Sequence, residues 1–99
     1  MISQVIKSDR KGKKYNAILT DGKEIHFGSD VSQTYVEGAS KQKRDNYFKR
    51  HLANPVEKEH VENLVMSPAL LSAYLLWLTP SLENNIKTLN KELRKKRNL

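Results

Sequence analysis

An apolar run over residues 67–82, SPALLSAYLLWLTPSL, constrains this chain more than any other stretch, because most of the remaining sequence is polar and basic. Ser67-Pro68 predicts a helix start, since a serine hydroxyl caps free backbone N–H groups and proline is tolerated in the first turn. Thr79-Pro80 stops that helix and repeats the same start signal. We therefore predict two consecutive helices joined by a tight corner. The first is apolar on nearly every side and must be covered.

The composition allows one domain over residues 1–99 with a small core. Apolar residues make up 37% of the chain and charged residues 29%, so few side chains are available to fill an interior. The predicted core draws on the apolar helix and on four aromatic residues elsewhere: Leu70, Leu71, Tyr74, Leu75, Trp77, Leu78, Tyr15, Phe27, Tyr47 and Phe48. A domain with so lean a core gains stability from a partner.

Features that are missing from the sequence narrow the possible kinds of protein. It has no cysteine, which excludes disulfides, thiolate zinc sites and cysteine nucleophiles. Residues 1–14 lack the apolar segment of a secretory signal, and the longest apolar run is too short to span a bilayer as a helix. We therefore expect a protein that is not secreted and has no membrane span.

Residues 2–28 predict a three-stranded antiparallel meander. A turn over residues 9–12 separates the first strand from the second, and Asp21-Gly22 is a strong hairpin signal before the third. Alternation places Ile25 and Phe27 on the same face of the last strand. Three short strands are not stable alone, so one face of the sheet must pack on helices.

Residues 40–99 predict the helical part of an α+β fold, in which the meander packs on three to four helices. Ser40 is a suitable N-cap for a helix to about residue 52, and Asn54-Pro55 ends that helix. Residues 55–63 fit either another short helix or a loop. Over residues 81–96 the apolar side chains recur every three or four positions, which predicts an amphipathic helix.

The net charge of +7 is concentrated in two basic clusters, a pattern typical of proteins that bind a polyanion. The first cluster lies on the helix predicted after Ser40, and the second lies in the C-terminal tail. We predict that these residues contact nucleic acid or acidic protein surfaces: Lys41, Lys43, Arg44, Lys49, Arg50, Arg94, Lys95, Lys96 and Arg97. The alternative is that the first cluster is a solvated helix face and that the second complements a helix dipole.

Aromatic side chains can belong either to the core or to a contact surface. Tyr47 and Phe48 lie among the cations of the first cluster, where they could stack on unpaired bases, but their spacing with His51 favours the core. Tyr74 and Trp77 reach a flank of the apolar helix and are candidate docking residues for a protein partner, since aromatic anchors are common at interfaces. The alternative is that both belong to the core of the domain itself.

Motifs for catalysis and for metal binding are missing from the sequence. His26, His51 and His60 lie on different predicted elements and lack the spacing of metal ligands. Phosphate loops, nucleophile elbows and carboxylate pairs with an acid partner are missing as well. The glutamates of residues 57–62 fit a solvated face. We therefore expect no enzyme activity, no metal, no cofactor and no small-molecule substrate.

Several short motifs, taken in order, resemble a known family. The motifs are His26-Phe27-Gly28, Tyr35, Tyr47-x-x-Arg50-His51, and Leu76-Trp77 followed by Pro80-Ser81-Leu82. They resemble an uncharacterised family of small basic proteins found mainly in large eukaryotic DNA viruses. The resemblance implies the same architecture and a viral context, but no activity. The chain departs from the family pattern at Gly38-Ala39-Ser40, where the family usually has His-Lys-Asp, and at Ala73-Tyr74, where it usually has Arg-Trp.

The paired clusters, the lean core and this resemblance together lead us to expect a non-enzymatic structural component of a large assembly, such as a minor virion protein. Its basic surfaces would contact nucleic acid or acidic faces of neighbouring subunits. The alternatives are a DNA- or RNA-binding regulatory protein without sequence specificity, and a small ribonucleoprotein component. Each of these classes places the protein in the virion or in the interior of the host cell, in the cytoplasm or nucleus.

Overall fold

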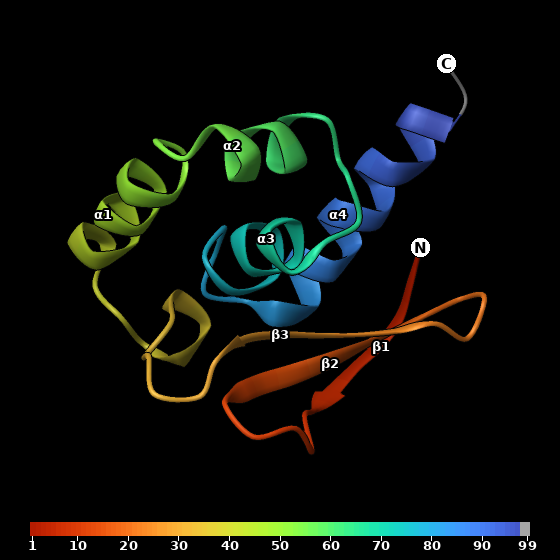
Figure 1. Ribbon diagram of the computed structural model, residues 1–99, viewed down its shortest axis with the longest axis horizontal. Coiled ribbons are helices and arrows are strands. Elements are labelled where there is room, and N and C mark those ends of the chain that lie inside the picture. Colours follow the sequence, from red (N-terminus) through yellow and green to blue (C-terminus); the bar gives the residue numbers. More distant parts are fainter. Residues whose placement is uncertain (98–99) are drawn as a thin grey trace.

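The computed structural model describes residues 1–97, and Asn98 and Leu99 at the end of the predicted tail lie outside the described residues. A three-stranded antiparallel sheet comes first and the helices follow, which confirms the predicted α+β fold (Figure 1). The strands are β1 (Ile2–Lys7), β2 (Lys13–Leu19) and β3 (Glu24–Ser29). The helical elements are η1 (Tyr35–Glu37), α1 (Lys41–His51), α2 (Pro55–Glu62), α3 (Pro68–Leu71), η2 (Ser72–Leu76) and α4 (Leu82–Arg97). Within residues 1–97 no helix is long and apolar enough to cross a membrane.

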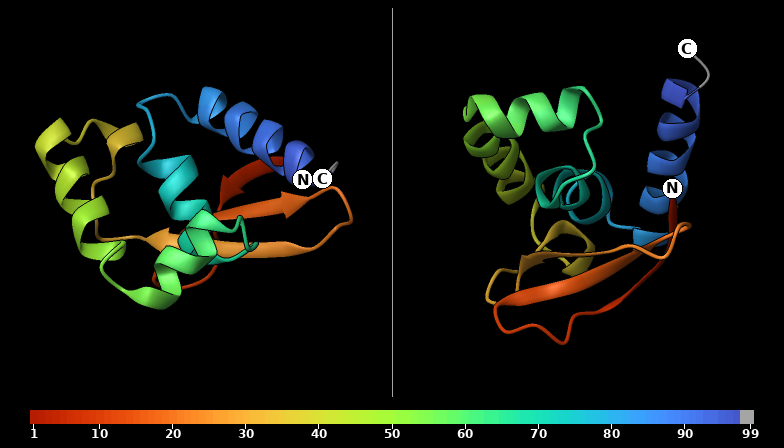
Figure 2. Two further views of the ribbon diagram at one scale, coloured as in Figure 1. Left: turned by 90° about the horizontal axis from the view of Figure 1, so that it is seen from above. Right: turned by 45° about the vertical axis from the view of Figure 1, so that its right-hand side comes forward.

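The strands form a meander in the order β1-β2-β3, as the two turn signals predict. Gly22 has a φ of +88° in the turn between β2 and β3, a conformation that glycine adopts readily. Ala17 and Phe27 are fully buried in the core, on the face of the sheet that the helices cover. Figure 1 and Figure 2 show the helices on one side of the sheet, with α3 over this face and α1 beyond its end. The predicted inward position of Phe27 is therefore confirmed.

The apolar run forms a short α-helix followed by a π-helix, rather than one continuous α-helix. Ser67 caps α3, as predicted, because its hydroxyl accepts a hydrogen bond from the Leu70 N–H at 3.2 Å. The chain then widens into η2, which is a π-helix. Ala73 and Leu76 on η2 are buried, whereas Leu78, which lies beyond the end of η2, is only half-buried. The prediction that Leu78 belongs to the core is therefore wrong.

Two other helix starts refine the sequence analysis. α4 begins after Ser81, whose hydroxyl accepts a hydrogen bond from the first turn of the helix at 3.2 Å, so the start predicted at Thr79 is wrong. Residues 55–63, for which the sequence allowed a helix or a loop, contain α2 (Pro55–Glu62), and the Asn54 side chain caps it. Leu89 lies on the inner side of α4 and is fully buried, which confirms the amphipathic pattern of that helix.

Asn85 on α4 is fully buried and holds the end of η2 in place. Its Nδ2 donates hydrogen bonds to the carbonyls of Leu75 and Thr79, each at 2.9 Å, while its Oδ1 accepts from the Thr79 hydroxyl at 2.6 Å. A π-helical partner for the Leu75 carbonyl would be the N–H of residue 80, which is a proline and has none. The amide of Asn85 therefore satisfies a carbonyl that the helix itself leaves without a donor.

Candidate functional site

Four of the five cations predicted to bind a partner on α1 lie at the surface: Lys41, Lys43, Lys49 and Arg50. We call these four residues the α1 surface. The helix starts at Ser40, whose hydroxyl accepts a hydrogen bond from the Lys43 N–H at 3.1 Å, and its buried side carries Tyr47. Because Tyr47 faces the core, the exposed cations occupy the remaining sides of the helix, where they can reach phosphates or carboxylates.

Arg44, the fifth cation, is half-buried and bonds to the backbone of another segment. Its Nε donates hydrogen bonds to the carbonyls of Trp77 at 2.8 Å and Leu78 at 3.2 Å, just beyond the end of η2. Its guanidinium also lies over the ring of Phe48, 4.9 Å from the ring centroid. The partner contact predicted for Arg44 is therefore corrected to a structural role, because carbonyls left free at a helix end recruit the guanidinium.

Trp77 belongs to the core and not to a docking surface. It is 5% exposed, and its ring stacks on Tyr47 with 4.5 Å between centroids and 8° between planes. A ring covered in this way cannot anchor a partner, so the docking role predicted for Trp77 is corrected. Burial, to which the Glu57 carboxylate adds, raises the pKa of Tyr47 to about 12. Tyr74, the other predicted docking residue, is half-buried at the edge of the core.

The C-terminal basic cluster is the end of a helix rather than a free arm. α4 continues to Arg97, and all four cations of the cluster are exposed. Lys96 donates from Nζ to the Asn63 carbonyl at 2.5 Å, which ties the end of α4 to the segment after α2. The other three cations, Arg94, Lys95 and Arg97, form what we call the α4 surface. Their position at a helix C-terminus also complements the negative end of the helix dipole.

The α1 surface and the α4 surface do not form one groove. Figure 1 and Figure 2 show α1 at one end of the molecule and the last turn of α4 at the other, with α3 and η2 between them. The longest dimension of the protein is 35 Å. Each surface can therefore contact a different partner, or distant parts of the same one.

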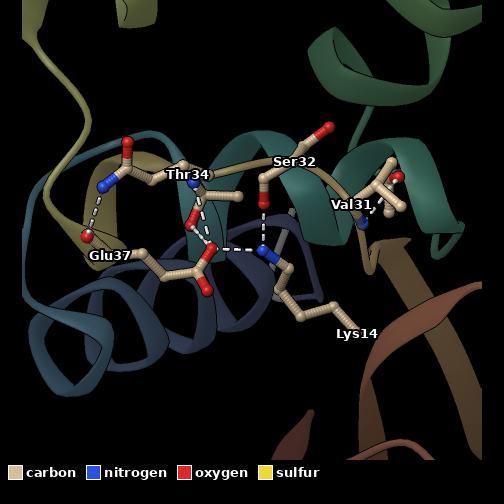
Figure 3. A network of polar contacts seen from close by, with 7 residues as sticks. Lys14, Val31, Ser32, Thr34 and Glu37 are labelled. Atoms are coloured by element: carbon tan, nitrogen blue, oxygen red, sulfur yellow. Dashed lines mark hydrogen bonds and ion pairs between the residues drawn. The ribbon is translucent and has the colours of Figure 1, made fainter.

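A polar network that the sequence analysis missed joins β2 to η1 (Figure 3). The Lys14 ammonium, on a side chain only 11% exposed, contacts the Glu37 carboxylate and the Ser32 carbonyl. The same carboxylate oxygen accepts hydrogen bonds from the Thr34 N–H at 3.0 Å and the Thr34 hydroxyl at 2.9 Å. Burial opposes ionisation of Glu37, but Lys14 and Thr34 outweigh it and lower the pKa of Glu37. The spacing Thr34-x-x-Glu37, a capping-box pattern, was the signal available in the sequence.

A pocket of 310 Å³ lies between the sheet, α1, α2 and α3, and it brings together residues of three of the short motifs. The motif residues that line it are Gly28, Tyr47, Arg50, His51, Leu76 and Trp77. His51 Nδ1 lies 3.1 Å from Glu57 Oε2, so one imidazole links α1 to α2 at the pocket wall. Sequence reasoning identified Arg50 but missed Glu57 and the pocket, because these residues meet only in the folded chain.

The three histidines lie apart from one another. His26 Nδ1 is 2.6 Å from Ser8 Oγ, His51 pairs with Glu57, and His60 lies on α2. In the part of the chain that the structure describes, no group of three or more His, Cys, Asp and Glu residues is placed to hold a metal ion.

Comparison with known proteins gives two matches. A family described only as "Family of unknown function (DUF5754)" matches residues 3–51, a range that contains the first three motifs and the α1 surface. An uncharacterized protein of Acanthamoeba polyphaga mimivirus is 33% identical over 79 residues, which cover 75% of this chain and 79% of that protein. No solved structure matches the chain.

Proposed function

The chain belongs to an uncharacterised family that occurs in large DNA viruses, and from that premise we propose that it is a non-enzymatic component of a viral assembly. The α1 surface and the α4 surface contact nucleic acid or acidic faces of neighbouring proteins. One observation carries this proposal, namely that two exposed basic helix surfaces stand at opposite ends of a small protein. A molecule of this kind can hold two polyanions at once and so bridge them.

The exposed groups suit phosphate contact better than base recognition. Flexible lysine and arginine side chains neutralise phosphates and release counterions whatever the sequence. The aromatic rings of Tyr47 and Trp77 pack against each other in the core, so they are not available to stack on unpaired bases. We therefore propose binding without sequence preference and with similar affinity for duplexes and single strands.

The bridging role is tested with two DNA duplexes that carry different fluorophores. Energy transfer between them is recorded as the purified protein is added, over about 50 to 300 mM salt. The wild type should bind and bridge the duplexes at low salt and lose both activities steeply as salt increases. Two variants follow: the α1 variant, with Lys41, Lys43 and Lys49 changed to Gln, and the α4 variant, with Arg94, Lys95 and Arg97 changed to Gln. Each should still bind a duplex, with a shallower salt slope, but should no longer bridge.

A matched control neutralises three exposed cations that lie outside both surfaces, Lys23, Lys58 and Lys87, each of which pairs with a nearby carboxylate. This control variant should bind and bridge as the wild type does. Bridging by the α1 variant or the α4 variant at the wild-type level would contradict the proposal. If the wild type binds neither a duplex nor a single strand at the lowest salt, nucleic acid is excluded as the partner.

The place of the protein in an assembly is tested separately, by its abundance in purified virus particles. A structural component should be present in many copies per particle, as quantitative mass spectrometry would show. A protein that is scarce in particles but abundant in infected cells would instead be a regulator, and the assembly proposal would fail.

A further inference from the structure

The 310 Å³ pocket shares Arg50 with the α1 surface, but unlike either basic surface it is lined by elements from most of the fold. Gly12, in the turn before β2, and Gly28, on β3, line it on one side, and α1, α2 and α3 supply the walls. The π-helix η2 supplies Ser72, Ala73 and Leu76. Small-molecule pockets in proteins span roughly 300–1,000 Å³, so this one suits a compact ligand.

The backbone at this pocket is unusual in two ways. π-helical turns are rare and are frequently found at functional sites, and η2 is such a turn. β3 approaches η2 so closely that a Cβ atom on Gly28 would lie 3.0 Å from Leu76 Cδ1, and the φ of Gly28 is +79°. The Leu76 side chain of η2 is therefore packed directly against the backbone of β3 on this side of the pocket.

The charged groups that line the pocket favour an anion. Lys13 and Arg50 contribute two positive charges and Glu57 one negative charge, so the lining carries +1 with His51 neutral and +2 with His51 protonated. Glu57 is already engaged by His51 at 3.1 Å. No ion pair within residues 1–97 uses Arg50 or Lys13. Two cations are thus available to a ligand, while the one carboxylate is occupied.

We propose that this pocket binds a phosphate monoester. The planar guanidinium of Arg50 matches phosphate oxygens in a bidentate manner, and Lys13 adds a second positive charge. Ser29 and Ser32 add hydroxyl groups to the lining, and apolar side chains such as Val61 cover the organic part of the ligand. The monoester is either a free small molecule or the terminal phosphate of a nucleic-acid strand, because both present the same chemistry.

Trp77 provides the readout, since it is the one tryptophan of the chain and lines the pocket. The full chain is titrated with phenyl phosphate, inorganic phosphate and phenol while the tryptophan fluorescence is recorded. Phenyl phosphate should give a saturable change. Inorganic phosphate should bind more weakly because it lacks the apolar part, and phenol should give no saturable change over the same concentrations. A wild-type protein that gives no saturable signal with phenyl phosphate overturns the proposal.

Two variants and one control locate the binding site. Arg50→Gln removes an exposed guanidinium and should weaken phenyl phosphate binding by about tenfold or more. Ala69→Leu keeps every charge but fills part of the pocket, and should also weaken binding. Lys87→Gln removes one positive charge from an exposed position on α4 and should leave binding unchanged. Wild-type affinity in Arg50→Gln, or in a folded Ala69→Leu, would place the anion elsewhere and overturn the proposal.

The two possible sources of the monoester are separated by competition. Two short single strands that differ only in a 5′-phosphate are tested for displacement of phenyl phosphate. A terminal-phosphate ligand makes the phosphorylated strand the better competitor, and Arg50→Gln removes the difference. Equal competition by the two strands assigns the pocket to a free small ester. The α1 variant retains Arg50, so its phenyl phosphate binding should be intact even where bridging is lost, which separates this proposal from the proposed function.

Discussion

The Arg44 guanidinium bonds to two carbonyls beyond the end of η2, while its neighbour Lys43 extends into solvent. We expect Arg44→Gln to lower the free energy of unfolding by about 2 kcal/mol, because two carbonyls lose a charged donor. Duplex binding by the folded variant should change little. Lys43→Gln should do the reverse, with a change in stability below about 0.5 kcal/mol and weaker binding. Urea denaturation followed by tryptophan fluorescence measures the first effect, and equal destabilisation by both variants would contradict the assignment.

Gly28 is constrained both by its φ of +79° and by the nearby Leu76 side chain. Gly22 has a similar φ of +88°, but no atom lies within 4 Å of the position that a Cβ would occupy there, so Gly22→Ala isolates the cost of the backbone conformation. We expect Gly22→Ala to lower the free energy of unfolding by about 1 kcal/mol and Gly28→Ala by about 3 kcal/mol. Thermal and urea unfolding of the two variants measure the difference. Equal losses would show that β3 and η2 are not closely packed.

At the scale of the element, η2 depends on a residue from another helix. Asn85 is fully buried, and both the oxygen and the nitrogen of its side-chain amide make hydrogen bonds. We expect Asn85→Ala to lower the free energy of unfolding by about 3 kcal/mol, because it leaves the Leu75 carbonyl buried without a donor and creates a small cavity. Asn84→Ala, at the exposed neighbouring position, is the control. A small loss in Asn85→Ala would mean that η2 holds its shape without α4.

The attachment of η1 to the sheet depends on pH. The pKa of Glu37 is lowered from 4.5 in the folded state, so its carboxylate stabilises the fold above pH 4.5. This contribution is lost as the pH falls through the folded-state pKa. Glu37→Gln should therefore flatten the fall in unfolding free energy as the pH is lowered below 4.5, as urea titrations at each pH would measure. Glu59→Gln, at an exposed position on α2, should retain the wild-type slope.

The sequence predicts elements well where the signal is local. Turn glycines and serine caps located the strands and the starts of α1 and α3, because each such residue acts on backbone within a few positions of itself. Hydrophobic spacing could not distinguish the α-helical and π-helical parts of the apolar run. The choice depends on Asn85, which comes later in the chain. The pocket and the inward turn of Arg44 were missed for the same reason, since their partners are distant in sequence.

At the scale of the whole molecule, one side chain joins the first strand to the last helix. Asn90 accepts a hydrogen bond from the Ile2 N–H at 2.8 Å and donates one to the Ile2 carbonyl at 3.0 Å. We expect Asn90→Ala to lower the free energy of unfolding by about 1 to 2 kcal/mol and to speed amide exchange in β1 more than in β2 or β3. Hydrogen exchange by NMR measures this. Uniform acceleration across the sheet would mean that β1 does not open on its own.

That same pairing has a kinetic consequence. Ile2 and Asn90 are separated by 88 positions, whereas the hairpin of β2 and β3 closes around a short turn. Contacts of long sequence separation form late, because closing a long loop costs more entropy than closing a short one. Both hairpins, β1 with β2 and β2 with β3, can therefore form while the chain is still being made, but the contact of Ile2 with Asn90 must wait for α4. The most N-terminal of the three strands thus completes its contacts only when the last helix has been made.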